Sequence, residues 1–150
     1  MVNFWRIVGS SELRDASDVD SALEKLSGRL AVLGPEELVR FSEKLREALY
    51  RLDRRGLAEI PVNVRGMTFP QTDDQFLYAR CACILAGEDV YDATLRFNDE
   101  FARFATPFVQ RAERLLYLPS EAYEKIVGRK MESGSGFPID SGSNVQGWLD

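Results

Sequence analysis

The side chains with the clearest potential for chemistry lie close together in the middle of the chain. Asp73 and Asp74 are adjacent carboxylates, which could hold a divalent cation or perform acid–base chemistry. Tyr78 and Arg80 follow within two turns of a helix and could orient an anionic ligand. Together with Tyr91, these residues form the candidate binding site, and none of them is assigned a catalytic role.

The stretch that carries this cluster, residues 72–87, predicts a buried helix. Thr72 and Gln75 match a capping box, and Gly87 provides a left-handed stop. The residues between are apolar on every side, which is typical of a helix surrounded by others. Adjacent acids in its first turn complement the helix dipole and point about 100° apart. Capping therefore explains the two acids better than catalysis does.

Arg80 is the one conspicuous charge inside this apolar helix. An unpaired buried guanidinium is very costly. We therefore expect Arg80 to form an ion pair with a carboxylate from elsewhere in the chain, and the alternative is that it lines a ligand cavity. A deep pocket shared by Arg80 and one of the acids would favour the ligand.

Composition excludes several kinds of site. The chain has 150 residues, no histidine and a net charge of -5. Without histidine the usual general base, the Ser-His-Asp and Cys-His arrangements and most zinc sites are absent. Cys81 and Cys83 point about 200° apart on the helix, so we expect two packed thiols. The sequence predicts no metal site and no cofactor, and its acidity argues against nucleic acid or an anionic membrane as partner.

The sequence also predicts a cytoplasmic location. It has no apolar run of about 18 residues that could span a membrane. Its first residues lack the apolar core of a signal peptide.

Helical periodicity covers most of the chain. Apolar residues recur at spacings of three and four, and a short apolar turn at 3–8 packs the N-terminus. Pro107 breaks the segment after residue 98, with Thr106 as the expected cap of a new start. The predicted helices lie at 17–33, 35–56, 72–87, 88–97, 98–116 and 119–128.

Residues 57–71 are the least regular part before the tail. Hydrophobic residues alternate there around Pro61, but no partner strand is visible, so we predict an extended crossover. Met67 and Phe69 look exposed, which makes this segment a candidate functional loop.

The predicted fold class is all-α, a single compact bundle of about six or seven helices around the central helix. Residues 1–128 form the helical domain. Residues 129–150 form a Ser/Gly-rich tail that is flexible or peripherally docked, because it is poor in packing residues. The residues that could dock it are Phe137, Ile139, Trp148 and Leu149.

Several of these motifs together resemble a bacterial family catalogued as domain of unknown function 4240. Its motif usually reads Ser-Asp-Asp-x-Phe-x-Tyr-Phe-Arg-x-Trp-Leu-Ile-x-x-Gly, followed by a tyrosine. This chain departs from it at Ala79, where an aromatic residue is usual, and at 81–83, where the tryptophan region falls. The resemblance covers residues 3–128 and implies a helical fold but no activity. The matching residues are Thr72, Asp73, Asp74, Phe76, Tyr78, Arg80, Ile84, Gly87 and Tyr91.

Three functions follow from these observations. The first is a non-enzymatic binding or regulatory module that acts on a protein partner, for instance a basic one. It rests on the lack of histidine, metal-ligand spacing, phosphate-binding loops and nucleophile elbows. The second is an enzyme or small-molecule binder that uses the cluster around Arg80. The third is an oligomerisation domain, such as a homodimer, formed through the tail or the 67–69 loop.

Overall fold

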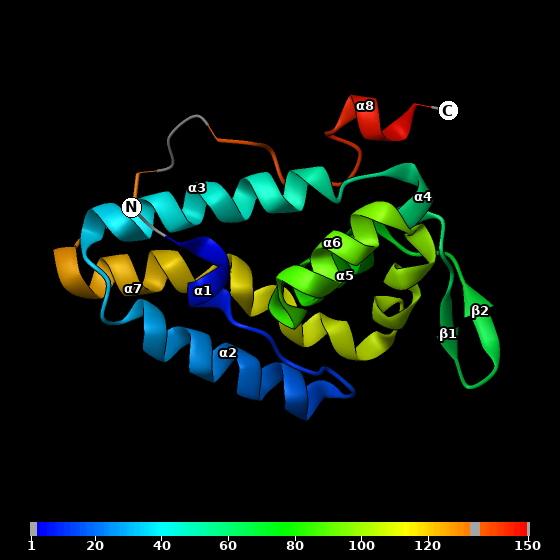
Figure 1. The fold of residues 1–150 in the computed structure, drawn as a ribbon, viewed down its shortest axis with the longest axis horizontal. Coiled ribbons are helices and arrows are strands. Elements are labelled where there is room, and N and C mark those ends of the chain that lie inside the picture. The colour runs from blue at the N-terminus through cyan, green and yellow to red at the C-terminus, as the bar shows by residue number, and fades with distance from the viewer. Residues whose placement is uncertain (1–2, 133–135, 150) are drawn as a thin grey trace.

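The structure, a computed structural model, describes residues 3–132 and 136–149. It confirms the all-α fold class, with α5 (Asp73–Ala86) at the centre of the bundle (Figure 1). Every residue of α5 from Ala79 to Ala86 is buried. The elements packed against α5 are α2 (Ala16–Leu30), α3 (Pro35–Arg51), α6 (Glu88–Arg96), η1 (Asn98–Phe104) and η2 (Pro107–Leu116), of which the last two are 3₁₀ helices.

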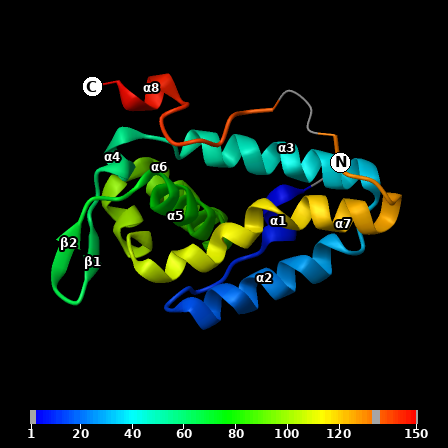
Figure 2. The same ribbon diagram turned by 180° about the vertical axis from the view of Figure 1, so that it is seen from behind.

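The long helices form a layer beside α5. Helix α7 (Leu118–Val127) lies between α2 and α3 and packs against both, as Figures 1 and 2 show from opposite sides. The first helix, α1 (Phe4–Val8), contacts α2 and α3 and buries the N-terminal end. The short helices α4 (Arg55–Ala58) and α8 (Val145–Trp148) pack together beyond the end of α3.

The signals at the two ends of α5 work partly as predicted. The Thr72 hydroxyl accepts a hydrogen bond from the Gln75 N–H at 3.1 Å, which confirms the cap. The Gln75 side chain does not return to Thr72; its amide donates to the Thr106 carbonyl at 2.9 Å. Gly87 ends the helix with φ +115° and ψ 174°, so the predicted left-handed conformation is wrong, and a Cβ there would lie 2.8 Å from the Ser10 Cβ. Close approach of the chain, as well as conformation, therefore requires glycine at this helix end.

The predicted crossover at 57–71 is wrong, because the segment forms a hairpin. Strands β1 (Val62–Val64) and β2 (Met67–Phe69) pair in antiparallel register. The two turn residues, Arg65 and Gly66, have φ of +54° and +83°, as a type I′ turn requires. Each strand has only three residues, and the turn between them is an Arg-Gly pair. The alternation of apolar and polar residues that marks a strand is therefore too short to recognise in the sequence. Both apolar residues of β2 are exposed, as predicted.

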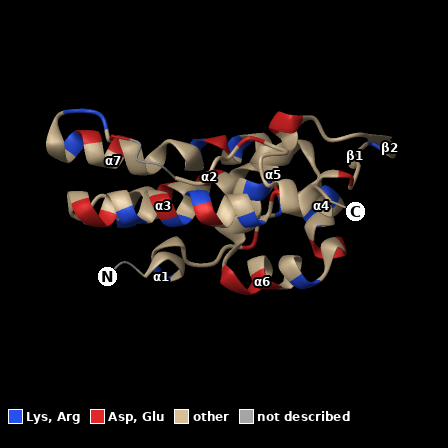
Figure 3. Cartoon of the chain, turned by 90° about the horizontal axis from the view of Figure 1, so that it is seen from above, with Lys and Arg blue, Asp and Glu red and all other residues tan. Residues whose placement is uncertain are grey.

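Several helix boundaries differ from prediction, and α2 for instance ends at Leu30 rather than at residue 33. Helix α2 begins one residue earlier, because the Asp15 carboxylate accepts the Asp18 N–H at 2.9 Å and caps it. Helix α3 ends at Arg51, and Gly56 belongs to α4. A new helix does begin after Thr106, but its side chain makes no capping hydrogen bond. Charged residues of both signs alternate along the outer side of α3 (Figure 3).

Candidate functional site

The structure places four of the candidate residues on α5 and the fifth, Tyr91, on α6. Asp73 and Asp74 are exposed in its first turn, where they face the helix dipole. Tyr78 points toward η2 instead, where a hydrogen bond with Glu113 raises the pKa of Tyr78 to about 12. The charge of Asp74, one turn earlier on the same side of α5, also raises that pKa, so Asp74 and Tyr78 are neighbours.

Tyr91 and Arg80 meet instead at the C-terminal turn of α3. The last carbonyls of a helix lack partners within it. The Tyr91 hydroxyl donates to the Ala48 carbonyl at 2.9 Å, and Arg80 Nη1 donates to the Leu49 carbonyl at 3.0 Å. The guanidinium also complements the negative end of the helix dipole. Both side chains thus donate hydrogen bonds to carbonyls at the end of α3 that lack partners within the helix.

The predicted ion pair of Arg80 is wrong. Its side chain is fully buried, yet among the described residues no carboxylate lies within salt-bridge distance of it. All of its hydrogen bonds go to neutral oxygens. Burial lowers the pKa of the guanidinium, and the charge of nearby Asp53 opposes that effect. The Phe76 ring lies 4.6 Å from the guanidinium carbon and supports it from one side.

The remaining hydrogen bonds of Arg80 reach the C-terminal tail. Nη2 donates to the Ile139 carbonyl at 3.0 Å and to the Ser141 hydroxyl oxygen at 3.1 Å. The Ser141 hydroxyl in turn donates to the Asp73 carbonyl at 2.9 Å. The tail thus lies across the same face of α5 as Arg80 and closes it from solvent.

Asp53, just beyond α3, binds the next part of the tail. Its carboxylate is fully buried and accepts the main-chain N–H groups of Gly142 and Asn144, each at 2.9 Å. It also accepts the indole N–H of Trp148 at 2.8 Å. The Asn144 amide donates to the Tyr50 carbonyl at 3.0 Å, so the tail supplies a further cap to α3. One buried carboxylate therefore fixes both the backbone and the end of the tail.

Two aromatic contacts flank these hydrogen bonds. The Phe137 ring lies 5.0 Å from that of Tyr50, and the Trp148 ring lies edge-on to that of Phe76 at 6.3 Å. Figure 1 shows the tail running back along α3 to α8. We refer to the body residues that hold it as the docking site; they are Tyr50, Asp53, Asp73, Phe76 and Arg80.

The docking site holds the tail partly through the main chain of the tail. A buried carboxylate accepts N–H groups, and a buried guanidinium donates to a carbonyl, so both halves of the peptide unit find a charged partner.

Throughout the described ranges, no cluster of side chains could hold a metal ion. No helix in those ranges combines the length and apolar character needed to cross a membrane.

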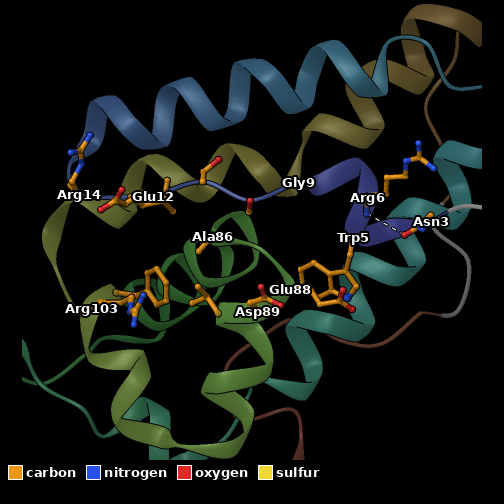
Figure 4. A pocket seen from close by; sticks show the side chains of 15 residues that line it. Asn3, Trp5, Arg6, Gly9, Glu12, Arg14, Ala86, Glu88, Asp89 and Arg103 are labelled. Carbon is orange, nitrogen blue, oxygen red and sulfur yellow. Dashed lines mark hydrogen bonds between the residues drawn. The ribbon is translucent and has the colours of Figure 1, made fainter.

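A large hollow lies elsewhere, between the 9–14 segment, the start of α6 and η1 (Figure 4). Its volume is about 1010 Å³. Arg14 and Arg103 lie on one side of it, and Glu88 and Asp89 approach from α6. Side chains of both signs line it, so its charge selects no class of ligand.

The two cysteines are buried and reduced, as predicted. Burial raises the pKa of both Cys81 and Cys83 to about 12. We therefore expect thiol reagents at pH 8 to modify the chain only after it unfolds, because the thiolate is the reactive form. A chain labelled while still folded would contradict the packing of α5.

The same shifts predict a loss of stability in alkali. A raised pKa favours the folded, protonated thiol, so its contribution is complete below about pH 9 and disappears as the pH rises toward 12. Each thiol should add a slope of about -1.4 kcal/mol per pH unit to the free energy of unfolding. Denaturant titrations between pH 8 and 11 would measure it. The Cys81→Ala/Cys83→Ala variant should lose that part of the slope and keep the part due to tyrosines.

Sequence reasoning did not single out Asp53. It follows a helix within an ordinary polar turn, and its partners lie 89 to 95 residues further along the chain. No local pattern marks a carboxylate whose burial depends on such a distant segment.

A family model described as "Protein of unknown function (DUF4240)" matches residues 1–125. No curated protein and no solved structure matches the chain. The whole docking site therefore lies in the matched part, whereas the segment that occupies it, residues 136–149, lies beyond it.

Proposed function

This chain belongs to the DUF4240 family of proteins of unknown function, and from that premise we propose that it is a protein-binding module. Its docking site would hold an extended segment of a partner protein. In the structure the chain's own residues 136–149 take that place. The supporting observation is that two buried charges, Asp53 and Arg80, direct most of their hydrogen bonds to that segment.

The two charges of the docking site depend on the tail for their hydrogen bonds. Asp53 accepts all three of its hydrogen bonds from the tail, and Arg80 keeps only the Leu49 carbonyl within the family-matched part. Without an occupant, Asp53 would lose these hydrogen bonds together with the burial that makes them strong. This dependence of a charged pair on the tail supports a docking site that holds a peptide segment across this face.

Several of the contacts between the docking site and the tail involve only the main chain of the tail. The groups bound at residues 139, 142 and 144 are main-chain carbonyl and N–H groups, which every protein segment carries. A segment from another protein could make them equally well. The chain's own tail would then act as an intramolecular competitor, present at a high effective concentration because it is tethered.

A single glycine provides a way to open the docking site. A Cβ at Gly147 would lie 2.5 Å from the Asp53 carbonyl oxygen and 3.1 Å from the Arg54 Cγ. Gly147→Ala should therefore release α8 while leaving every body residue unchanged. Gly28→Ala is the matched control, because a Cβ at Gly28 meets nothing within 4 Å.

The test adds a fluorescein-labelled peptide with the sequence of residues 136–149 to each full-length chain. We expect the Gly147→Ala chain to bind it at least tenfold more tightly than the wild-type and Gly28→Ala chains, because the competitor is released. Adding Arg80→Met to Gly147→Ala should abolish the binding. Fluorescence anisotropy gives the affinities, and circular dichroism checks that each chain is folded. Absence of binding to a folded Gly147→Ala chain would overturn the proposal.

A further inference from the structure

We propose that the partner segment carries the pattern Gly-x-Asn-x-x-Gly-Trp, as residues 142–148 do. This inference rests on the proposed function and specifies which segments the docking site accepts. Each of the four fixed positions meets a different requirement of the docking site or of the bound conformation.

The glycine before the tryptophan is required by space. In α8 the backbone of Gly147 passes so close to Asp53 that a Cβ would meet the Asp53 carbonyl oxygen at 2.5 Å. That neighbour is main chain, which cannot rotate away as a side chain could. A segment with any larger residue at this position would have to lie further from the body.

The tryptophan is required by its N–H. The indole Nε1 of Trp148 donates to Asp53 Oδ1 at 2.8 Å, while its ring packs edge-on to Phe76. Phenylalanine would keep an aromatic ring but lose the donor. A charge-assisted hydrogen bond to a buried carboxylate is among the stronger contacts that a side chain makes.

The asparagine and the first glycine set the shape of the segment. Asn144 donates its main-chain N–H to Asp53 and its side-chain amide to the Tyr50 carbonyl. Its side-chain oxygen also accepts the Gly147 N–H at 3.3 Å, which caps α8. Gly142 has φ +89°, a conformation that glycine adopts without strain. The two residues thus place the N–H groups of 142 and 144 on the two oxygens of one carboxylate.

The experiment measures a panel of labelled peptides of residues 136–149 against the full-length Gly147→Ala chain. Relative to the unaltered peptide, we expect peptides with Gly147→Ala or Trp148→Phe to bind about tenfold or more weakly, because each loses a buried contact. A peptide with Val145→Ala is the matched control and should bind unchanged, since Val145 is 65% exposed. The full-length Trp148→Phe chain provides a second host in case Gly147→Ala disturbs folding.

The possible results separate the two proposals. If all peptides bind equally, the sequence pattern is wrong and the protein-binding function stands. If none binds to either folded host, both proposals fail. Light scattering of the wild-type chain at rising concentration tests whether the docking site is occupied by the tail of a second copy of the chain. A dimer that disappears with Gly147→Ala would show that the partner is the tail of a second copy, and would overturn the assignment to another protein.

Discussion

Replacing Arg80 by methionine should lower the free energy of unfolding by about 3–5 kcal/mol, because it leaves the oxygens of Leu49, Ile139 and Ser141 without their shared donor. Methionine keeps much of the apolar stem but removes the cation from the end of α3. The Leu49 carbonyl then loses its donor, and buried Asp53 loses the positive charge that faces it. Urea titration of both chains at pH 7 would measure the difference.

Two further variants decide how this loss arises. Arg129→Met removes a guanidinium from an exposed position and should change stability by less than about 0.5 kcal/mol. In a double-mutant cycle, Arg80→Met and Asp53→Asn together should cost less than the sum of the single changes, because the second removes the charge that the first leaves uncompensated. Purely additive costs would show that the two charges do not interact. A loss below 1 kcal/mol for Arg80→Met alone would show that the guanidinium does not support α3.

The sequence predicts the central helix well because its signals are local. A hydroxyl cap, acids in the first turn, an uninterrupted apolar run and a glycine at the end are all contained within 72–87. The structure places the helix there and buries it as the pattern indicates. The hairpin was missed for the converse reason, since each of its strands has only three residues and periodicity needs more.

The site is less predictable because its contacts are distant in sequence. The composition of α5 shows that Arg80 must find a partner, but not that the partner is a carbonyl 59 residues away. A buried cation does not require an anion in contact with it. The structure instead surrounds the guanidinium with neutral oxygens and leaves Asp53 to compensate it from further off. Such a division of roles depends on the tail, which has no periodic pattern of its own.

Replacing Phe76 by alanine should have an effect of similar size, a loss of about 3–5 kcal/mol, because it removes a large side chain from a closed core. Phe76 is 1% exposed and packs edge-on to Phe101 at 5.8 Å. It also supports the Arg80 guanidinium at 4.6 Å and contacts Trp148. Phe97→Ala is the matched control, because Phe97 is 64% exposed and should lose less than about 0.5 kcal/mol.

The same substitution in the Gly147→Ala chain separates the core from the docking site. If the tail is released in that chain, the contact with Trp148 is already lost, and Phe76→Ala should cost less there than in wild type. The remaining loss then belongs to Phe101 and Arg80, which stay in the body whether or not the tail is docked. Equal losses in the two chains, measured by urea titration, would mean that Phe76 serves the core alone. The docking of the tail would then depend on the hydrogen bonds of Asp53 and Arg80.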